Sequence, residues 1–227
     1  MTKKIIAVDL DGTLLNSESK LSDFTKETIK KISEKGHYVI ITTGRPYRMA
    51  KDFYRDLELH TPMINFNGSL THLPGQAWAH EKCLTLDKKY LLDMVKRTED
   101  IQADFIAGEY RKKFYITAPN EEIADPKLFG VENFQPENQF KPERVTKNPN
   151  CILLQTRVED KYALADEMNR FYQHQLAINT WGGPLNILEC TPKGVNKAFA
   201  LEYLLNVMNR EKKDLIACGD EHNDTEM

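Results

Sequence analysis

The sequence predicts an α/β fold with a parallel β-sheet. Short runs of β-branched residues alternate with segments of helical spacing at the amino end, and this alternation returns near the carboxyl end. The stretch between has a different character, with strands, helices and tight turns typical of an α+β module. We therefore expect a core domain formed by residues 1–82 and 191–227, and an inserted α+β domain formed by residues 83–190.

The first 82 residues predict strands and helices in alternation. Lys4–Val8 is a short apolar run with an abrupt polar end, as expected of a buried strand. Ser22–Lys35 has a loose helical spacing, with Ser22 as a plausible N-cap and Gly36 as a plausible stop. The other elements predicted here are a buried strand at 38–42, a helix at 47–57 that begins after Pro46 and a short strand at 63–66.

In the inserted domain, residues 83–190, the sequence predicts both helices and strands. Its predicted helices are 86–98 and 161–172, and its predicted strands are 103–106, 114–116 and 152–156. A polar stretch with several prolines separates two of these strands, and a hairpin is expected to turn at Gly182-Gly183-Pro184 and to return through Leu185–Leu188. The α/β pattern then returns with a helix at Asn196–Met208 and a buried strand at Asp214–Cys218.

Composition narrows the class of protein. The chain has 227 residues, 41% of them hydrophobic, which is enough for a packed core and too many for a disordered chain. The net charge of −3 disfavours a protein that binds nucleic acid through a basic surface. No apolar run approaches the roughly 18 residues that span a bilayer, and the run at Ile5–Val8 is too short for a signal peptide.

The four cysteines are far apart and form no CxxC pair. This spacing disfavours a zinc site and fits thiols in a reducing compartment. We therefore expect a cytoplasmic protein that does not associate with membranes.

The first polar cluster with possible chemistry is Asp9-Leu10-Asp11-Gly12-Thr13, directly after a predicted strand. Carboxylates at i and i+2 at a strand end can point into one crevice and attract a hard cation such as Mg²⁺. An ionised Asp9 can attack phosphorus without a base to activate it, and Asp11 can serve as the acid and base. The alternative is a turn that the aspartates merely close.

The second cluster is Thr42-Thr43-Gly44-Arg45-Pro46, at the end of another predicted strand. A hydroxyl followed by glycine and a helix start offers O–H and backbone N–H groups to a phosphate. A strand-to-helix turn with a threonine N-cap would show the same pattern.

The third cluster places lysines at the start of a helix, in the segment Thr191-Pro192-Lys193-Gly194-Val195-Asn196-Lys197. The helix dipole disfavours a cation there, so a lysine at this place makes sense if a phosphate lies next to it. An ordinary solvated lysine is the alternative.

The fourth cluster follows the last predicted strand and reads Gly219-Asp220-Glu221-His222-Asn223-Asp224. Three acids and an amide in six residues would make a strongly negative loop unless a cation binds there. An acidic surface loop or a helix cap is the alternative. Because ligand sites in open α/β sheets lie beyond the carboxyl ends of the strands, we expect all four clusters to converge.

The order of these motifs, DxDGT, TGR, GxxK and GDxxND, resembles that of the haloacid dehalogenase-like phosphatases, and most closely their Cof-type bacterial branch. The resemblance spans the whole chain. It implies a Rossmann-like core with an inserted α+β cap of the C2 type, and Mg²⁺-dependent hydrolysis of a small phosphate monoester through a phospho-aspartate. A sugar phosphate is the expected substrate class.

The resemblance also implies roles for single residues. Asp9 matches the nucleophile, Asp11 matches the acid and base, and GxxK selects Lys197 over Lys193. The implied metal ligands are Asp9, Asp11 through its backbone carbonyl, and Asp220. The implied phosphate-binding residues are Leu10, Thr43, Gly44, Lys197 and Asn223. The residues implied behind the ligands or at the mouth are Asp224, Arg45, Asn67 and Gly68. Cap residues that could contact the substrate are Tyr110, Trp181 and Asn186, although a packing role is the simpler interpretation for each.

Other interpretations stay open at this point. The resemblance implies a core that is incomplete at its C-terminus, because relatives continue for several elements after GDxxND. The protein could then bind phosphorylated metabolites without turning them over, or it could be a phosphosugar mutase. A dinucleotide-binding enzyme is disfavoured because no GxGxxG follows the first strand. We expect a small phosphorylated metabolite as the partner and no nucleic acid, and the sequence leaves a homo-oligomer open.

Overall fold

A computed structural model describes residues 3–227 of the chain, and they divide into two compact units. One unit contains the residues up to Cys83 together with Val195–Met227, and the other is Leu84–Gly194. We expected the inserted domain to be 83–190, whereas the second junction lies after Gly194 because strand β10 continues to Pro192. None of the described helices is long and apolar enough to cross a membrane.

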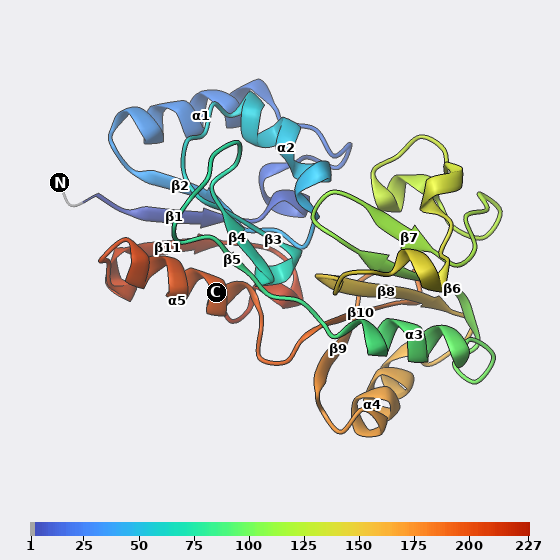
Figure 1. The fold of residues 1–227 in the computed structure, drawn as a ribbon. Coiled ribbons are helices and arrows are strands. Elements are labelled where there is room, and N and C mark those ends of the chain that lie inside the picture. The colour runs from blue at the N-terminus through green and yellow to red at the C-terminus, as the bar shows by residue number, and fades with distance from the viewer. Residues whose placement is uncertain (1–2) are drawn as a thin grey trace. The chain divides into compact units, whose positions relative to one another are not determined.

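A three-stranded parallel sheet lies at the centre of the first unit (Figure 1). Its strands are β1 (Ile5–Val8), β2 (Tyr38–Ile41) and β11 (Leu215–Cys218), in the order β11-β1-β2. The register aligns the last residues of the three strands with one another. The loops that follow these strands therefore start at one edge of the sheet.

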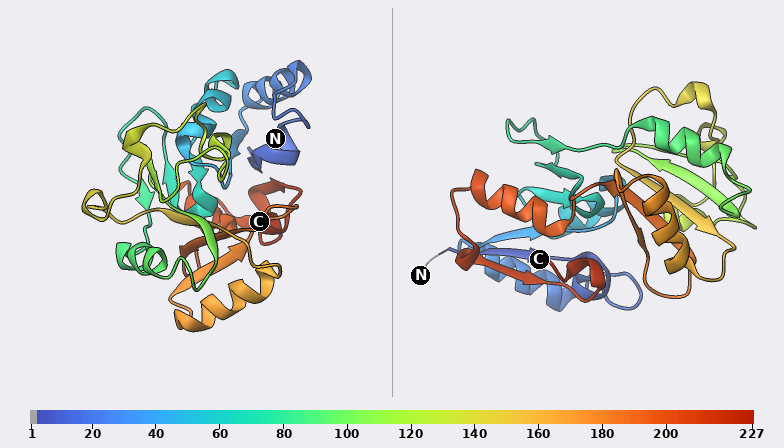
Figure 2. Two further views of the ribbon diagram at one scale, coloured as in Figure 1. Left: turned by 90° about the vertical axis from the view of Figure 1, so that its right-hand side faces the viewer. Right: turned by 90° about the horizontal axis from the view of Figure 1, so that it is seen from below.

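Helices cover both faces of this sheet, as the right-hand view of Figure 2 shows for α1 and α5. The helices are α1 (Asp23–Glu34), α2 (Tyr47–Asp56) and α5 (Lys197–Val207). One apolar cluster joins α1 and α2 to one face of the sheet, and another joins α5 to the opposite face. Ser22 is the N-cap of α1, as predicted, because its Oγ accepts a hydrogen bond from the Thr25 N–H at 3.0 Å.

A second, antiparallel sheet extends the first unit. It contains β3 (Met63–Asn65), β4 (Leu70–His72) and β5 (Lys82–Cys83). The strand predicted at 63–66 is β3, and a parallel bridge between Thr42 and Ile64 links it to the end of β2 in the parallel sheet. The strands β4 and β5 were not predicted, because their two to three residues are too few to show a periodicity.

The other unit contains a five-stranded antiparallel sheet in the order β7-β6-β8-β10-β9, and helices α3 and α4 pack against one of its faces (Figure 1). Its elements are α3 (Lys88–Lys96), β6 (Ala103–Glu109), β7 (Phe114–Ile116), β8 (Cys151–Thr156), α4 (Lys161–Phe171), β9 (Leu176–Thr180) and β10 (Ile187–Pro192). An α+β module was predicted here, and the predicted hairpin is the β9–β10 pair.

Short turns complete the chain. A π-type turn follows β1 at Leu10–Leu14. The 3₁₀ turns are Phe66–Gly68, Pro126–Phe129, Pro136–Asn138, Pro142–Arg144, Lys212–Asp214 and His222–Asp224.

The prediction that the strand before Gly219 is buried was wrong. β11 is largely exposed, and Ile216 is 46% exposed. The reason is its position, since among the described residues β11 is an edge strand that pairs only with β1. An apolar sequence indicates a strand but does not indicate its place in the sheet.

Candidate active site

The parallel register brings three of the four motif clusters to one edge of the sheet. The Asp9 N–H donates to the Cys218 carbonyl at 3.0 Å, and the Thr42 N–H donates to the Val8 carbonyl at 2.8 Å. The loops after β1, β2 and β11 therefore leave the sheet side by side. The fourth cluster reaches the same place because α5 packs across the sheet and begins at Lys197.

Lys197 is the centre of this site. Its Nζ donates to Asp9 Oδ1 at 2.8 Å and to Asp224 Oδ1 at 2.6 Å. Only 1% of the lysine side chain is exposed, and the two carboxylates are nearly as buried. Asn196 Oδ1 caps α5 by accepting from the Phe199 N–H, so Lys197 is the first residue of the helix. The Lys197 ammonium thus lies between Asp9, near the N-terminal end of the sequence, and Asp224, near its C-terminal end.

The surroundings of Asp9 act on its ionisation in opposite directions. Burial raises the pKa of the Asp9 carboxyl above its usual value, and the adjacent Lys197 ammonium opposes that rise. The neighbouring Asp224 carboxylate adds to the rise. A bound cation would favour the ionised carboxylate that a nucleophile requires.

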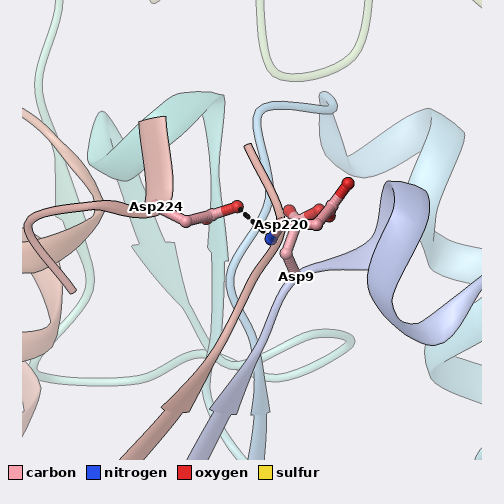
Figure 3. Close-up of side chains that lie close together, drawn as sticks. All are labelled: Asp9, Asp220 and Asp224. Carbon is pink, nitrogen blue, oxygen red and sulfur yellow. Dashed lines mark hydrogen bonds between the residues drawn. The ribbon is translucent and has the colours of Figure 1, made fainter. Parts of the chain in front are cut away.

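Three carboxylates could together hold a metal ion. Asp9, Asp220 and Asp224 each offer an oxygen, and these oxygens lie within 4.8 Å of one another. Figure 3 shows Asp9 and Asp220 on the loops after β1 and β11. Asp224 Oδ2 accepts from the backbone N–H groups of Asp220 and Glu221, both at 3.2 Å, and so holds the acidic loop closed. Carboxylate oxygens are the ligands that Mg²⁺ prefers, so this donor set fits that ion.

Close packing keeps Asp220 next to the first motif. Thr13 Oγ1 donates to Asp220 Oδ1 at 2.8 Å. A Cβ on Gly12 would lie 2.0 Å from Asp220 Oδ2, and Gly12 also has a φ of +73°. Only glycine therefore fits between the Asp11 backbone and the acidic loop.

The Asp11 side chain lies apart from the three clustered carboxylates. Its two oxygens accept from Arg45, with Arg45 Nε donating to Oδ2 at 2.7 Å and Nη2 donating to Oδ1. The Asp11 side chain is 51% exposed, against 7% for Asp9. The structure thus gives two carboxylates that are two residues apart very different environments.

The remaining predicted positions surround this centre. Thr43 is buried, and its Oγ1 accepts from the Arg45 N–H at 3.1 Å. Leu10 is fully buried. Asn67 Oδ1 accepts from Asn223 Nδ2 at 3.1 Å, which ties the loop after β3 to the acidic loop. Gly44 and Gly68 lie in close backbone contacts, with Gly44 facing the Asn67 amide and Gly68 facing the Asn196 carbonyl.

Two buried polar residues near this site were not predicted from the sequence. Asn65 Nδ2 donates to the Arg45 carbonyl at 2.9 Å, and Asn65 Oδ1 lies 2.9 Å from His72 Nε2. Both side chains are fully buried. No motif contains them. Asn65 is a polar residue within a predicted apolar strand, whereas His72 lies in β4, which was not predicted, so no signal marked it.

Residues proposed for substrate contact in the inserted domain have structural partners. Tyr110 is buried with its ring edge against Tyr115. Trp181 Nε1 donates to Glu189 Oε2 at 3.3 Å, and Asn186 Nδ2 donates to the Val158 carbonyl at 3.2 Å. Lys193 is exposed and belongs to this unit, not to the unit that contains Asp9.

Comparison with known proteins agrees with this geometry. Residues 6–227 match the family described as haloacid dehalogenase-like hydrolase. The 5-amino-6-(5-phospho-D-ribitylamino)uracil phosphatase YitU of Bacillus subtilis (strain 168) is 30% identical over 228 residues, which cover 98% of this chain and 82% of that protein. A second phosphatase of that name from the same organism, YcsE, is 26% identical, with coverage of 99% and 79%.

Solved structures share the fold. A crystal structure of a Thermotoga maritima protein superimposes with a TM-score of 0.78 at 24% identity, covering 98% of this chain and 82% of that one. The likeness extends over both compact units, so the α/β core and the inserted module occur together in that structure too.

Proposed function

Because the chain belongs to the haloacid dehalogenase-like hydrolase family, we propose that it hydrolyses a small phosphate monoester through a phospho-aspartate on Asp9. The observation that carries the proposal is the buried contact of Lys197 with Asp9 and Asp224 at the carboxyl edge of the sheet. A buried carboxylate nucleophile next to a fixed ammonium suits the attack on a phosphate dianion, because the cation offsets the repulsion between the two anions.

The relatives support a sugar phosphate or sugar-alcohol phosphate as the substrate. Two of them carry names that specify a phosphorylated ribitylamino compound, in which the phosphate lies on a sugar-alcohol chain. We extend to this protein only the chemical class, a phosphate ester of a primary alkyl alcohol. The inserted unit, Leu84–Gly194, is proposed to contact the organic part of the substrate.

The proposed reaction has two balanced steps. In the first, an Asp9 oxygen forms a bond to phosphorus, the bond from phosphorus to the ester oxygen breaks, and the departing oxygen takes a proton from the Asp11 carboxyl. In the second, a water molecule gives a proton to the Asp11 carboxylate and attacks phosphorus. The phosphoryl–aspartate bond then breaks, which releases phosphate and restores both aspartates.

Mg²⁺ is the proposed cofactor. Asp9 and Asp220 would hold it, together with the backbone carbonyl of Asp11, and Asp224 lies close enough to support or join the set. When bound, the ion would supply positive charge to the phosphate oxygens. Lys197 already balances part of the charge of these carboxylates, and Thr43 with its following backbone is proposed to bind the phosphate oxygens.

We propose that the protein is cytoplasmic. Cys151 and Cys190 are buried thiols, and burial raises the pKa of Cys151 well above its usual value, so it stays protonated. Unoxidised cysteines of this kind are ordinary in a reducing compartment.

The experiment is a measurement of inorganic phosphate released from a panel of sugar phosphates, sugar-alcohol phosphates, nucleotides and p-nitrophenyl phosphate. Each compound is tested with Mg²⁺ and with EDTA. We expect release that requires Mg²⁺ and is fastest for alkyl phosphates of sugar or sugar-alcohol type. An isomerised sugar phosphate in place of free phosphate would show that the protein is a mutase and not a hydrolase. If the folded protein released no phosphate from any compound of the panel, the proposal would be refuted.

A further inference from the structure

Arg45 binds Asp11, the proposed acid and base, through two N–H groups on one edge of its guanidinium. Arg45 Nε donates to Asp11 Oδ2 at 2.7 Å, while Nη2 donates to Oδ1. This two-point contact fixes the plane of the carboxylate as well as its position. An exposed aspartate would otherwise exchange among rotamers, since its side chain is 51% accessible.

Arg45 is itself held in place from several directions. Its N–H donates to Thr43 Oγ1 at 3.1 Å, and its carbonyl accepts from Asn65 Nδ2 at 2.9 Å. The guanidinium carbon lies 5.5 Å from the centre of the Phe53 ring, within the range of a cation–π contact. The Arg45 side chain is only 21% exposed.

The anchoring of Arg45 continues into the protein interior. Asn65 Oδ1 lies 2.9 Å from His72 Nε2, and both residues are fully buried on strands β3 and β4. The His72 ring also meets the Tyr47 ring edge to face, with their centres 4.9 Å apart. A buried polar pair at this place is explained by the Arg45 carbonyl that it binds, because buried polar groups need partners.

We propose that Arg45 is a positioning residue that orients the Asp11 carboxylate for proton transfer. The inference rests on the proposed function, since it assigns Asp11 the proton that leaves with the ester oxygen. In the contacts described above, Arg45 touches none of the three clustered carboxylates, so its effect reaches the reaction through Asp11. Oxygens held at fixed positions lose less freedom when the ester oxygen and the attacking water arrive.

The test compares two substrates that differ in their need for an acid. The departing oxygen of an alkyl phosphate needs a proton, whereas the p-nitrophenolate anion is stable enough to leave without one. The ratio kcat/KM reports the steps from substrate binding through the transfer of the phosphoryl group to Asp9. We expect Arg45→Ala to lower kcat/KM for the alkyl phosphate by roughly 10- to 100-fold, and to change it for p-nitrophenyl phosphate by less than about threefold.

Three further variants show whether Arg45 acts through Asp11. Asp11→Asn should give the same substrate pattern, and Arg45→Ala added to Asp11→Asn should cause little further loss. Arg45→Lys keeps the charge but not the two-point contact, so it should fall between wild type and Arg45→Ala. Arg55→Ala is the matched control, because Arg55 is an exposed arginine on helix α2, which begins just after Arg45, and it pairs only with the surface aspartates Asp52 and Asp56 in the ion pairs described.

The outcomes separate this inference from the proposed function. If wild type releases phosphate but Arg45→Ala slows both substrates equally, or slows the Asp11→Asn enzyme as much as wild type, Arg45 is a substrate-binding or structural residue and the inference is wrong. If wild type releases no phosphate from either substrate, the proposed function fails, and the role of Arg45 in it fails as well.

Discussion

At the scale of one residue, Lys197 shows how the buried charges of the site are balanced. Its ammonium contacts Asp9 and Asp224 and is almost completely removed from water. Such a group is costly to bury, and the cost is offset only while both partners stay in place. Lys197 could be predicted because a cation at a helix start requires an anion nearby. Its contact with two carboxylates could not be predicted, because Asp224 is 27 residues away and reaches Lys197 only in the folded chain.

Replacing Lys197 should lower both the stability of the protein and its phosphatase activity. Lys197→Met would leave two buried carboxylates without their cation, so we expect the free energy of unfolding to fall by about 3–5 kcal/mol. Phosphate release should fall at least about 100-fold, because the charge that faces the phosphate is lost. Urea unfolding in EDTA measures the first quantity and a phosphate assay the second.

Lys193→Met is the control for this prediction. Lys193 is exposed, so its replacement should change stability by no more than about 0.5 kcal/mol and leave phosphate release unchanged. Equal effects of the two substitutions would contradict the role given to Lys197.

At the scale of the element, the turn after β3 positions the loops of the site. Phe66, Asn67 and Gly68 are three successive residues with positive φ, of 51°, 50° and 106°. Strained backbone of this kind often occurs at functional sites. The turn places the Asn67 amide beside Asn223 and brings Gly68 against the start of α5. The residue types of this turn could be read from the sequence, but its backbone conformation could not.

Gly68→Ala tests the close approach of this turn to α5. A Cβ at Gly68 would lie 2.3 Å from the Asn196 carbonyl oxygen, whereas a Cβ at Gly75, with a φ of +76°, would have open space around it. Gly75→Ala should therefore cost only the conformational term of about 1–2 kcal/mol. Gly68→Ala should cost a further ~1–3 kcal/mol from overpacking. Chemical denaturation of both variants gives the difference, and similar losses would show that the turn and α5 are not in contact.

The elements differ in how well the sequence predicts them. Long helices such as α1 and α5 were predicted to within a few residues, because caps and periodicity mark them. The exposure of β11 was predicted incorrectly, since pairing between strands depends on distant segments. The contact of Arg45 with Asp11 was missed for the same reason, because 34 residues separate them.

At the scale of the whole molecule, the two units have separate hydrophobic cores. One cluster lies between the antiparallel sheet and helices α3 and α4, and two others lie on opposite faces of the parallel sheet. The residues of the proposed chemistry all belong to the unit with the parallel sheet. Their convergence could be predicted, because the carboxyl ends of parallel strands meet at one edge. The resemblance implied Asp9 and Asp220 as metal ligands and Asp224 behind them. The position of the Asp224 oxygen beside those of Asp9 and Asp220 could be seen only in the folded chain.

The most direct test of the account is phosphate release by Asp9→Asn, compared with wild type on the best substrate of the panel in Mg²⁺. The substitution keeps the shape of the side chain but replaces the attacking carboxylate with an amide. We predict a folded protein with no release above background, and an acid-quenched phosphoryl adduct on the peptide that contains Asp9 in wild type alone. Release by Asp9→Asn at a rate near that of wild type would contradict the assignment of Asp9 as the nucleophile.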